Sequence, residues 1–287
     1  MTWLASCRKF LREAPWQLWT AQLTALIQSE VKRNFLKRRS IWIYLVAFAP
    51  TAILLMMVIQ NPPTGRDNIQ ESTSVMAHVF QIYYLRVGIF VGCLGIFTWL
   101  FRGEIVEKTL HYHFLSPMRR ELLVLGKFVA GMVTTTLIFV LGVFGSFFLI
   151  YAHGGAAGRA FVFDGPGMGH LVAYLGVTVL ACLGYGSIFV ALSLVIKNPI
   201  VPAIFVLGWE TFHAILPSLL QKFSIMFYLK QLSPVPVPSE GILALFAVGS
   251  DPVSPWLAVP GLLCLCTGIL IFACLRIRKM EISYLAD

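Results

Sequence analysis

The chain has 287 residues, of which 58% are hydrophobic and 12% are charged, and its mean hydropathy is +0.80. Soluble domains carry about 25% charged residues, so this composition excludes an ordinary soluble domain and indicates an integral membrane protein. The formal net charge of +9 then indicates a bias of Lys and Arg towards one side of a membrane, and we predict no binding of nucleic acid.

Apolar residues recur at steps of three and four between residues 15 and 39, which is typical of one face of a helix. The opposite face is polar and basic. We expect an amphipathic helix in the membrane interface, with Trp16 and Trp19 at headgroup depth and the basic face towards anionic lipids. The alternative is an ordinary soluble helix that packs on a partner protein.

Six apolar runs follow, each near the length of about 20 residues that crosses a bilayer as a helix. They cover residues 41–60, 79–101, 128–152, 171–196, 199–220 and 256–275. The predicted fold class is all-α, a polytopic membrane protein with six transmembrane helices. Residues 1–40 would form a cytosolic tail and the interfacial helix, and residues 41–287 would form the transmembrane domain.

The connecting segments on the outer side differ in composition. Residues 61–78 are predicted to be a polar loop, and residues 153–170 a flexible, glycine-rich one. Residues 217–255 remain apolar in two runs that are too short to span. We expect them to form a re-entrant outer helical hairpin, with Ser239 and Glu240 capping its second helix; a disordered outer loop is the alternative.

The distribution of Lys and Arg predicts the orientation in the membrane. If the N-terminus is cytoplasmic, the inner segments contain most of the 22 Lys and Arg residues. The remainder are Arg66, Arg86, Arg159, Lys222 and Lys230. This asymmetry places both termini in the cytoplasm.

The longest markedly charged segment inside the apolar part of the chain is residues 102–127, between the second and third predicted spans. A charge at the centre of a bilayer costs about 2.5–3.5 kcal/mol, so this segment cannot cross the membrane. We therefore expect a cytosolic connector that is long enough to fold and to bind another protein.

The residues of this connector resemble those of the loop between the second and third membrane helices in type-2 ATP-binding-cassette (ABC) permeases. The matching positions are Glu104, Glu107, Thr109 and Leu110, then Leu115, Pro117, Arg119 and Arg120, then Gly126 and Lys127. Lys108 stands where many members have Gly, which predicts a different local turn. The interfacial helix and the re-entrant segment also correspond to elements of that family.

The resemblance implies the transmembrane subunit of an ATP-driven exporter in the inner (plasma) membrane. A second permease copy, or a homologous permease, would form the substrate pathway with it, and a separate ATP-binding subunit would bind ATP and Mg. A short cytosolic coupling helix with Glu104, Glu107 and Thr109 would dock on that subunit. The family exports lipids, polysaccharides, peptides, drugs and ions, and no residue here selects among them.

The sequence contains no phosphate-binding loop of the form GxxxxGK[ST] and no hydrolytic triad. His111 and His113 point apart on a helix and have no further ligand at metal-binding spacing. We therefore predict that the chain is not an enzyme and holds no cofactor or metal. Two other classes remain open: a secondary transporter or channel that works without ATP, and a membrane scaffold without transport.

The predicted spans contain three residues with acidic or basic side chains. Glu210 and His213 are three residues apart in the fifth span and share a helix face. The resemblance makes both pathway candidates, because the fifth helix lines the central pathway in the family; the alternative for Glu210 is a structural hydrogen bond inside the bundle. Arg86 lies near the outer end of the second span, where its side chain reaches the interface.

Overall fold

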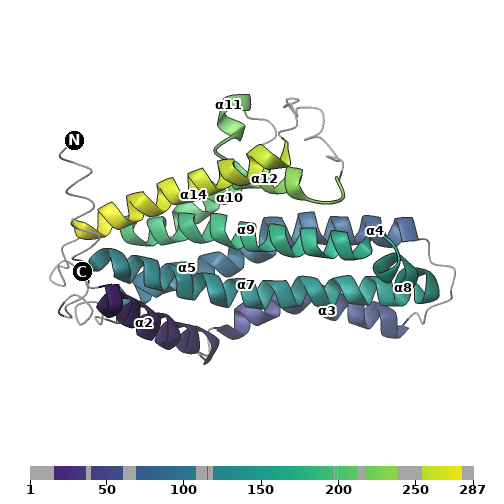
Figure 1. Ribbon diagram of the computed structural model, residues 1–287, viewed down its shortest axis with the longest axis horizontal. Helices are drawn as coiled ribbons and strands as arrows, with labels where there is room; N and C mark the ends of the chain where they lie inside the picture. The colour runs from purple at the N-terminus through teal and green to yellow at the C-terminus, as the bar shows by residue number, and fades with distance from the viewer. Residues whose placement is uncertain are drawn as a thin grey trace.

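The structure is a computed structural model that describes residues 16–36, 40–60, 69–107, 119–196, 200–212, 217–237 and 254–279, with the single residues 115 and 198. These parts of the chain are helical, with short turns and bends between some of the helices, as the all-α prediction requires. Figure 1 shows the long helices side by side in one elongated bundle, with α5, α7 and α9 at its centre.

Five helices within the described ranges are long and apolar enough to cross a membrane. They are α3 (Ser40–Gln60), the continuous helix α4 (Ile69–His78), η1 (Val79–Gly88) and α5 (Ile89–Val106), then α7 (Arg120–His153), α9 (Gly167–Val195) and α14 (Pro255–Arg278). They correspond to the first, second, third, fourth and sixth predicted spans.

The predicted fifth span, residues 199–220, is not one long helix. The structure contains α10 (Ile200–Thr211), which is apolar but shorter than a span, and then the single turn α11 (Ser218–Gln221) after Pro217. Proline lacks the backbone N–H that a continuous helix requires, and Pro217 directly precedes α11. The described part of the predicted outer hairpin, residues 217–255, contains α11 and the next helix, α12 (Ile225–Leu232); Ser239 and Glu240 lie outside the described residues.

Three connections are shorter than the sequence predicts. Residues 69–78 of the predicted polar loop form α4, and the predicted flexible segment 153–170 contains α8 (Gly155–Phe163). The charged segment 102–127 contributes its first residues to α5 and its last eight to α7. Charged residues do not by themselves indicate a loop, because a helix can extend beyond the apolar part of a span.

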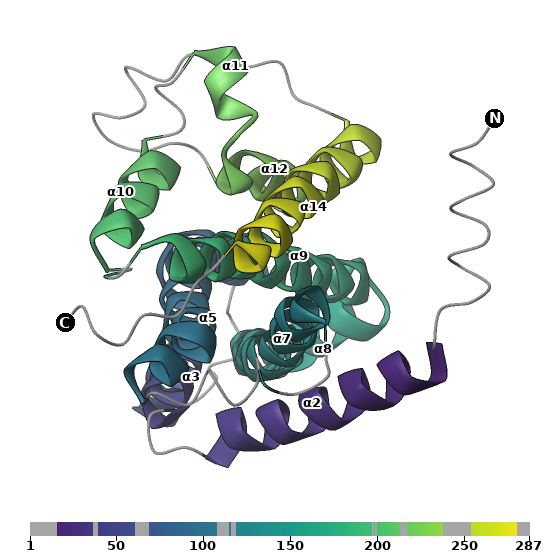
Figure 2. The same ribbon diagram turned by 90° about the vertical axis from the view of Figure 1, so that its left-hand side faces the viewer.

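Helix α2 (Trp16–Leu36) runs crosswise to the bundle at one end, whereas α7 and α9 are seen nearly end-on in the same view (Figure 2). It packs mainly against α7. A crosswise helix at the end of a bundle is the arrangement expected for a helix in the membrane interface.

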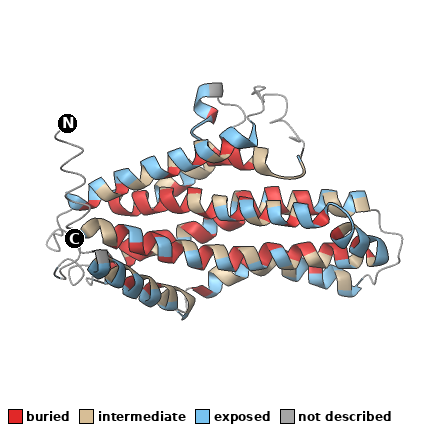
Figure 3. Ribbon diagram, viewed as in Figure 1, coloured by how far each residue is buried: buried red, intermediate tan, exposed pale blue. Residues whose placement is uncertain are grey.

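The core lies between α5, α7 and α9, where buried residues concentrate (Figure 3). Phe97 of α5 is fully buried, and its ring fills the space beside Gly131 of α7 and Gly186 of α9. A Cβ atom at Gly131 or Gly186 would lie 2.5 or 2.6 Å from that ring. Likewise, a Cβ at Gly92 would lie 2.3 Å from Phe139, so small residues permit close helix packing within the chain.

The second span changes its winding at η1, a π-helix of 10 residues between α4 and α5. A π-helix forms hydrogen bonds between residues five apart, is rare, and is frequent at functional sites. The backbone N–H of Ile89 accordingly bonds to the carbonyl of Tyr84. No pattern in the sequence indicates this π-helix, which contains Arg86.

Candidate functional site

The described chain has a charged junction at the end of the bundle where α2, α5, α7 and α14 meet. The pair Gly126–Lys127, near the start of α7, faces α2. A Cβ at Gly126 would lie 2.5 Å from the Leu26 side chain of α2, so the missing side chain admits Leu26. Leu26 and Glu30 are four residues apart and therefore share one face of α2, which brings Glu30 to Lys127.

Lys127 is fully buried, and its ammonium donates three hydrogen bonds to acceptor oxygens. Its Nζ donates to Oε1 of Glu30 at 2.9 Å, to Oε1 of Glu104 at 2.6 Å and to the backbone carbonyl of Leu100 at 3.0 Å. Arg33 completes this charge cluster, because its Nη2 contacts Oε2 of Glu30 at 2.5 Å and Oε1 of Glu104 at 2.9 Å. Two cations and two carboxylates thus join three helices.

The cluster is electrically balanced, which explains how it is tolerated in a buried place. Burial by itself lowers the pKa of Arg33, but the carboxylates of Glu30 and Glu104 outweigh this and raise its pKa above the ordinary value. A buried ion pair is weak evidence for net stability, but removing one partner leaves an uncompensated charge. The cluster therefore fixes the relative positions of α2, α5 and α7.

A second set of contacts ties the first turn of α7 to α2 and α14. The guanidinium of Arg119 lies 4.5 Å from the centre of the Trp19 ring of α2. Arg120 donates to the carbonyl of Arg278 at 3.2 Å, at the end of α14, and Arg278 forms an ion pair with Glu121. A cation at a helix C-terminus is favourable because it complements the negative end of the helix dipole.

Several of the predicted coupling residues lie in other elements than the short cytosolic helix expected from the sequence. Glu104 is not on a separate short helix: it lies in the last turns of α5, is 2% exposed and belongs to the charge cluster. Glu107 is exposed directly after α5, and its N–H bonds to the carbonyl of Gly103 at 2.9 Å. Arg119 and Arg120 lie at the start of α7, whereas Thr109, Leu110 and Pro117 are outside the described residues.

Glu210 is buried at 4% exposure and holds the first turn of α12. Its carboxylate accepts hydrogen bonds from Oγ of Ser224 at 2.7 Å and from the backbone N–H groups of Ile225 and Met226 at 3.1 and 2.8 Å. These N–H groups have no acceptor within the helix, so Glu210 serves as a cap supplied by α10. The contacts correspond to the structural alternative; His213 lies outside the described residues.

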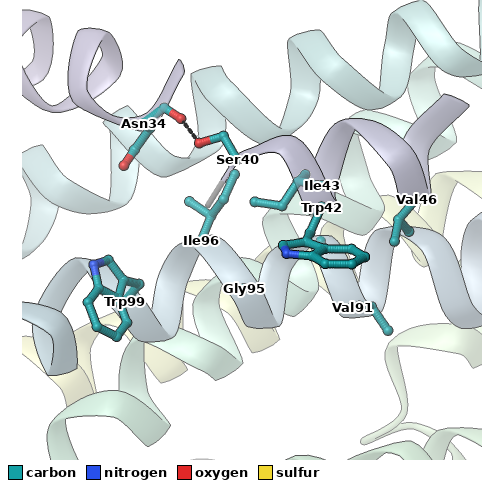
Figure 4. A pocket seen from close by; sticks show the side chains of 10 residues that line it. Asn34, Ser40, Trp42, Ile43, Val46, Val91, Gly95, Ile96 and Trp99 are labelled. Carbon is teal, nitrogen blue, oxygen red and sulfur yellow. Dashed lines mark hydrogen bonds between the residues drawn. The ribbon is translucent and has the colours of Figure 1, made fainter. Parts of the chain in front are cut away.

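A groove of about 340 Å³ lies between α3 and α5 near the same end of the bundle (Figure 4). Trp42 and Ile43 of α3 and Ile96 and Trp99 of α5 line it, together with Asn34, Ser40, Val46, Val91, Gly92 and Gly95. Its lining is mostly apolar, and Trp42 is 72% exposed. Such a lining suits contact with lipid chains or with another apolar helix.

The apolar helices define a multi-pass membrane protein with a charged junction at one end of the bundle. Residues 26–209 match the family model described as ABC-2 family transporter protein. This match covers more than half of the chain, so the chain belongs to that family and is a membrane permease of an ABC system, not itself a catalytic unit. The curated proteins compared with it include no match.

The sequence pattern does not show which residues the charged connector contacts. Glu30 and Arg33 belong to the polar face of the expected interfacial helix, and Lys127 to the expected cytosolic connector. One signal was present in the sequence: Glu30 and Arg33 continue the face that contains Leu26. That face is therefore mixed, with an apolar part and a charged part, and it contacts α7 rather than lipid alone.

Proposed function

We propose that this chain is the transmembrane subunit of an ATP-driven ABC exporter. A separate subunit binds and hydrolyses MgATP, both termini of the permease face the cytoplasm, and the junction of α2, α5, α7 and α14 lies at the cytosolic membrane surface. A second permease copy, or a homologous one, completes the substrate pathway.

The observation that carries this proposal is the buried charge cluster at both ends of the α5–α7 connector. Glu104 ends one span, Lys127 begins the next, and Glu30 and Arg33 hold α2 to both. A partner that pushes on the connector between them therefore moves three helices together. Glu104 acts in this proposal through the cluster, as a positioning residue, and the exposed Glu107 contacts the ATPase directly.

The exposure of the helices supports a second permease. Only 11% of the most apolar 18-residue stretch of α3 is buried within the protein, whereas 61% of the corresponding stretch of α9 is buried. Helix α10 likewise exposes Ile200, Val201 and Phe205 by 60% or more. We place the permease–permease contact and the pathway on the side formed by α3 and α10, with membrane lipids covering the remaining apolar surface.

Two measurements test the proposal. The tagged chain, purified from its source membrane, should carry an ATP-binding subunit in about equal amount, and the chain alone should hydrolyse no ATP. Glu107→Ala should lower transport-linked ATPase turnover without reducing membrane insertion, whereas Glu71→Ala, an exposed carboxylate at the other end of the bundle, should leave turnover unchanged. Transport by the chain alone in vesicles without ATP would instead identify a secondary transporter or channel.

A further inference from the structure

Arg86 is a charged residue in the continuous helix Ile69–Glu104, inside the π-helix η1. It is half-buried, and its Nε atom is buried without a hydrogen-bond partner. Burying a polar group without a hydrogen bond is costly. An ionisable residue in a span usually marks a pathway or a binding site.

The face of η1 that contains Arg86 is turned towards α12. Gln81 lies five residues before Arg86, which is the hydrogen-bonding repeat of a π-helix, so the two side chains share a face. Nε2 of Gln81 donates to the backbone carbonyl of Val235, just after α12, at 2.8 Å. Helix α12 also contacts η1 directly.

Lys230 of α12 is the second cation in this place. It is half-buried and is close enough to Arg86 for the two charges to repel each other. Within the described ranges neither side chain forms an ion pair. Glu210 also lies in this region, but Ser224 and the first N–H groups of α12 occupy its carboxylate oxygens.

We propose that Arg86 and Lys230 bind a phosphate-bearing anion. These two half-buried cations repel each other and have no carboxylate partner within the described ranges, and a bound anion would offset this repulsion and satisfy the Nε atom of Arg86. Phosphate suits the pair best, because a guanidinium donates two parallel hydrogen bonds to its oxygens and an ammonium adds a point charge. The ligand is the headgroup of an anionic lipid or a free phosphate compound.

The depth of the site agrees with a phosphate ligand. At about 1.5 Å per residue, Arg86 lies about 25 Å along the helix from Glu104. With Glu104 at the cytosolic surface, an orientation that rests on the function proposed above, Arg86 comes close to the outer boundary of a hydrocarbon core about 30 Å thick. Lipid phosphates lie at that boundary.

A structural role for Lys230 alone predicts a different result. Lys230 lies in the last turn of α12, where any cation is favourable for the helix dipole. Such a role requires no ligand and no contribution from Arg86. Loss of the same ligand on changing either residue therefore distinguishes a shared site from a helix-terminal charge.

The test uses the purified full-length permease in a neutral detergent, with bound lipid measured by native mass spectrometry. Phosphatidylglycerol should be retained in preference to diacylglycerol, which lacks the phosphate. Arg86→Gln and Lys230→Gln should each lower its apparent affinity about tenfold, since a hydrogen bond to a charged group contributes about 1.5–3 kcal/mol. Arg159→Gln and Lys222→Gln, which change exposed residues of the same types, should leave it unchanged.

Further arms identify the source of the phosphate and control for folding. Competition by millimolar inorganic phosphate or pyrophosphate would indicate a soluble phosphate ligand, and its absence a lipid headgroup; both agree with the proposal. Arg86→Lys keeps the charge and should retain part of the affinity if Arg86→Gln fails to fold. The proposed site is refuted if the parent and both Gln variants retain phosphatidylglycerol equally and inorganic phosphate does not compete with the lipid. The lipid-binding measurement uses the permease without an ATPase, so this result would not contradict the proposed exporter function.

Discussion

The Nζ atom of Lys127 lies 2.6 Å from Oε1 of Glu104, and this buried pair joins the last turns of α5 to the start of α7. The two residues bracket the charged connector in the sequence, so its two ends are fixed to each other. Glu30 and Arg33 extend the same contact to α2. Substitutions in this buried cluster should therefore affect stability more than substitutions in ion pairs at the surface.

Lys127→Met should destabilise the protein strongly, because the carboxylates of Glu30 and Glu104 would lose their buried cation. Breaking a buried pair from one side costs about 3–5 kcal/mol, which thermal unfolding of the detergent-solubilised protein can measure. Adding Glu104→Gln to this variant should recover much of the loss, since Arg33 and Glu30 then remain as a neutral pair. If the single variant melts like the parent, the cluster does not hold the junction.

Gly126→Leu should displace α2, because the new side chain would occupy the place of Leu26. Overpacking of this kind costs about 1–3 kcal/mol. Hydrogen exchange of the α2 amides should increase, while exchange in α9 stays the same. The double variant Gly126→Leu with Leu26→Ala makes room for the larger side chain and should restore protection of α2; failure to do so would mean that Leu26 is not what Gly126 accommodates.

Glu210→Gln should loosen the start of α12. The change replaces a charged acceptor by an amide, and hydrogen bonds to charged groups contribute about 1.5–3 kcal/mol. Faster hydrogen exchange at Ile225 and Met226 should report this, and Glu210→Ala should have a larger effect because it removes the acceptor entirely. Unchanged exchange together with altered export would assign Glu210 to the pathway instead of to the cap.

Glu121→Gln should have little effect on stability, although it removes the ion pair with Arg278. The Arg278 side chain is 60% exposed, and exposed pairs contribute about 0–1 kcal/mol. The melting temperature should therefore fall far less than for Lys127→Met. Similar losses in both variants would contradict the distinction between a buried cluster and a surface pair.

The sequence predicted most of the bundle because apolar runs of sufficient length are enough to locate spans. The apolar run at residues 199–220 does not form one long helix: α10 ends at Thr211, and Glu210 near its end caps another helix. Its acceptor role depends on Ser224, which lies 14 residues later beyond a turn. A local pattern does not show which distant N–H groups a carboxylate will meet.

From the sequence, the charged segment around Glu104 and Lys127 is expected to be a solvated connector, because charges in an apolar chain ordinarily lie in water. Glu30, the second carboxylate that contacts Lys127, is 97 residues away from it, and only the crosswise packing of α2 brings the two together. Likewise, the residues of η1 contain no pattern that indicates a π-helix.

The sequence separation between Glu30 and Lys127 also sets an order of events during synthesis. Glu30, Arg33 and Glu104 leave the ribosome before Lys127, the buried cation of the cluster, and at about 5–20 residues per second the interval between Glu30 and Lys127 is about 5–20 s. During this interval the carboxylate of Glu30 stays hydrated at the membrane surface. Docking of α2 therefore follows the emergence of the third span, and the junction is assembled only after the helices it joins have been made.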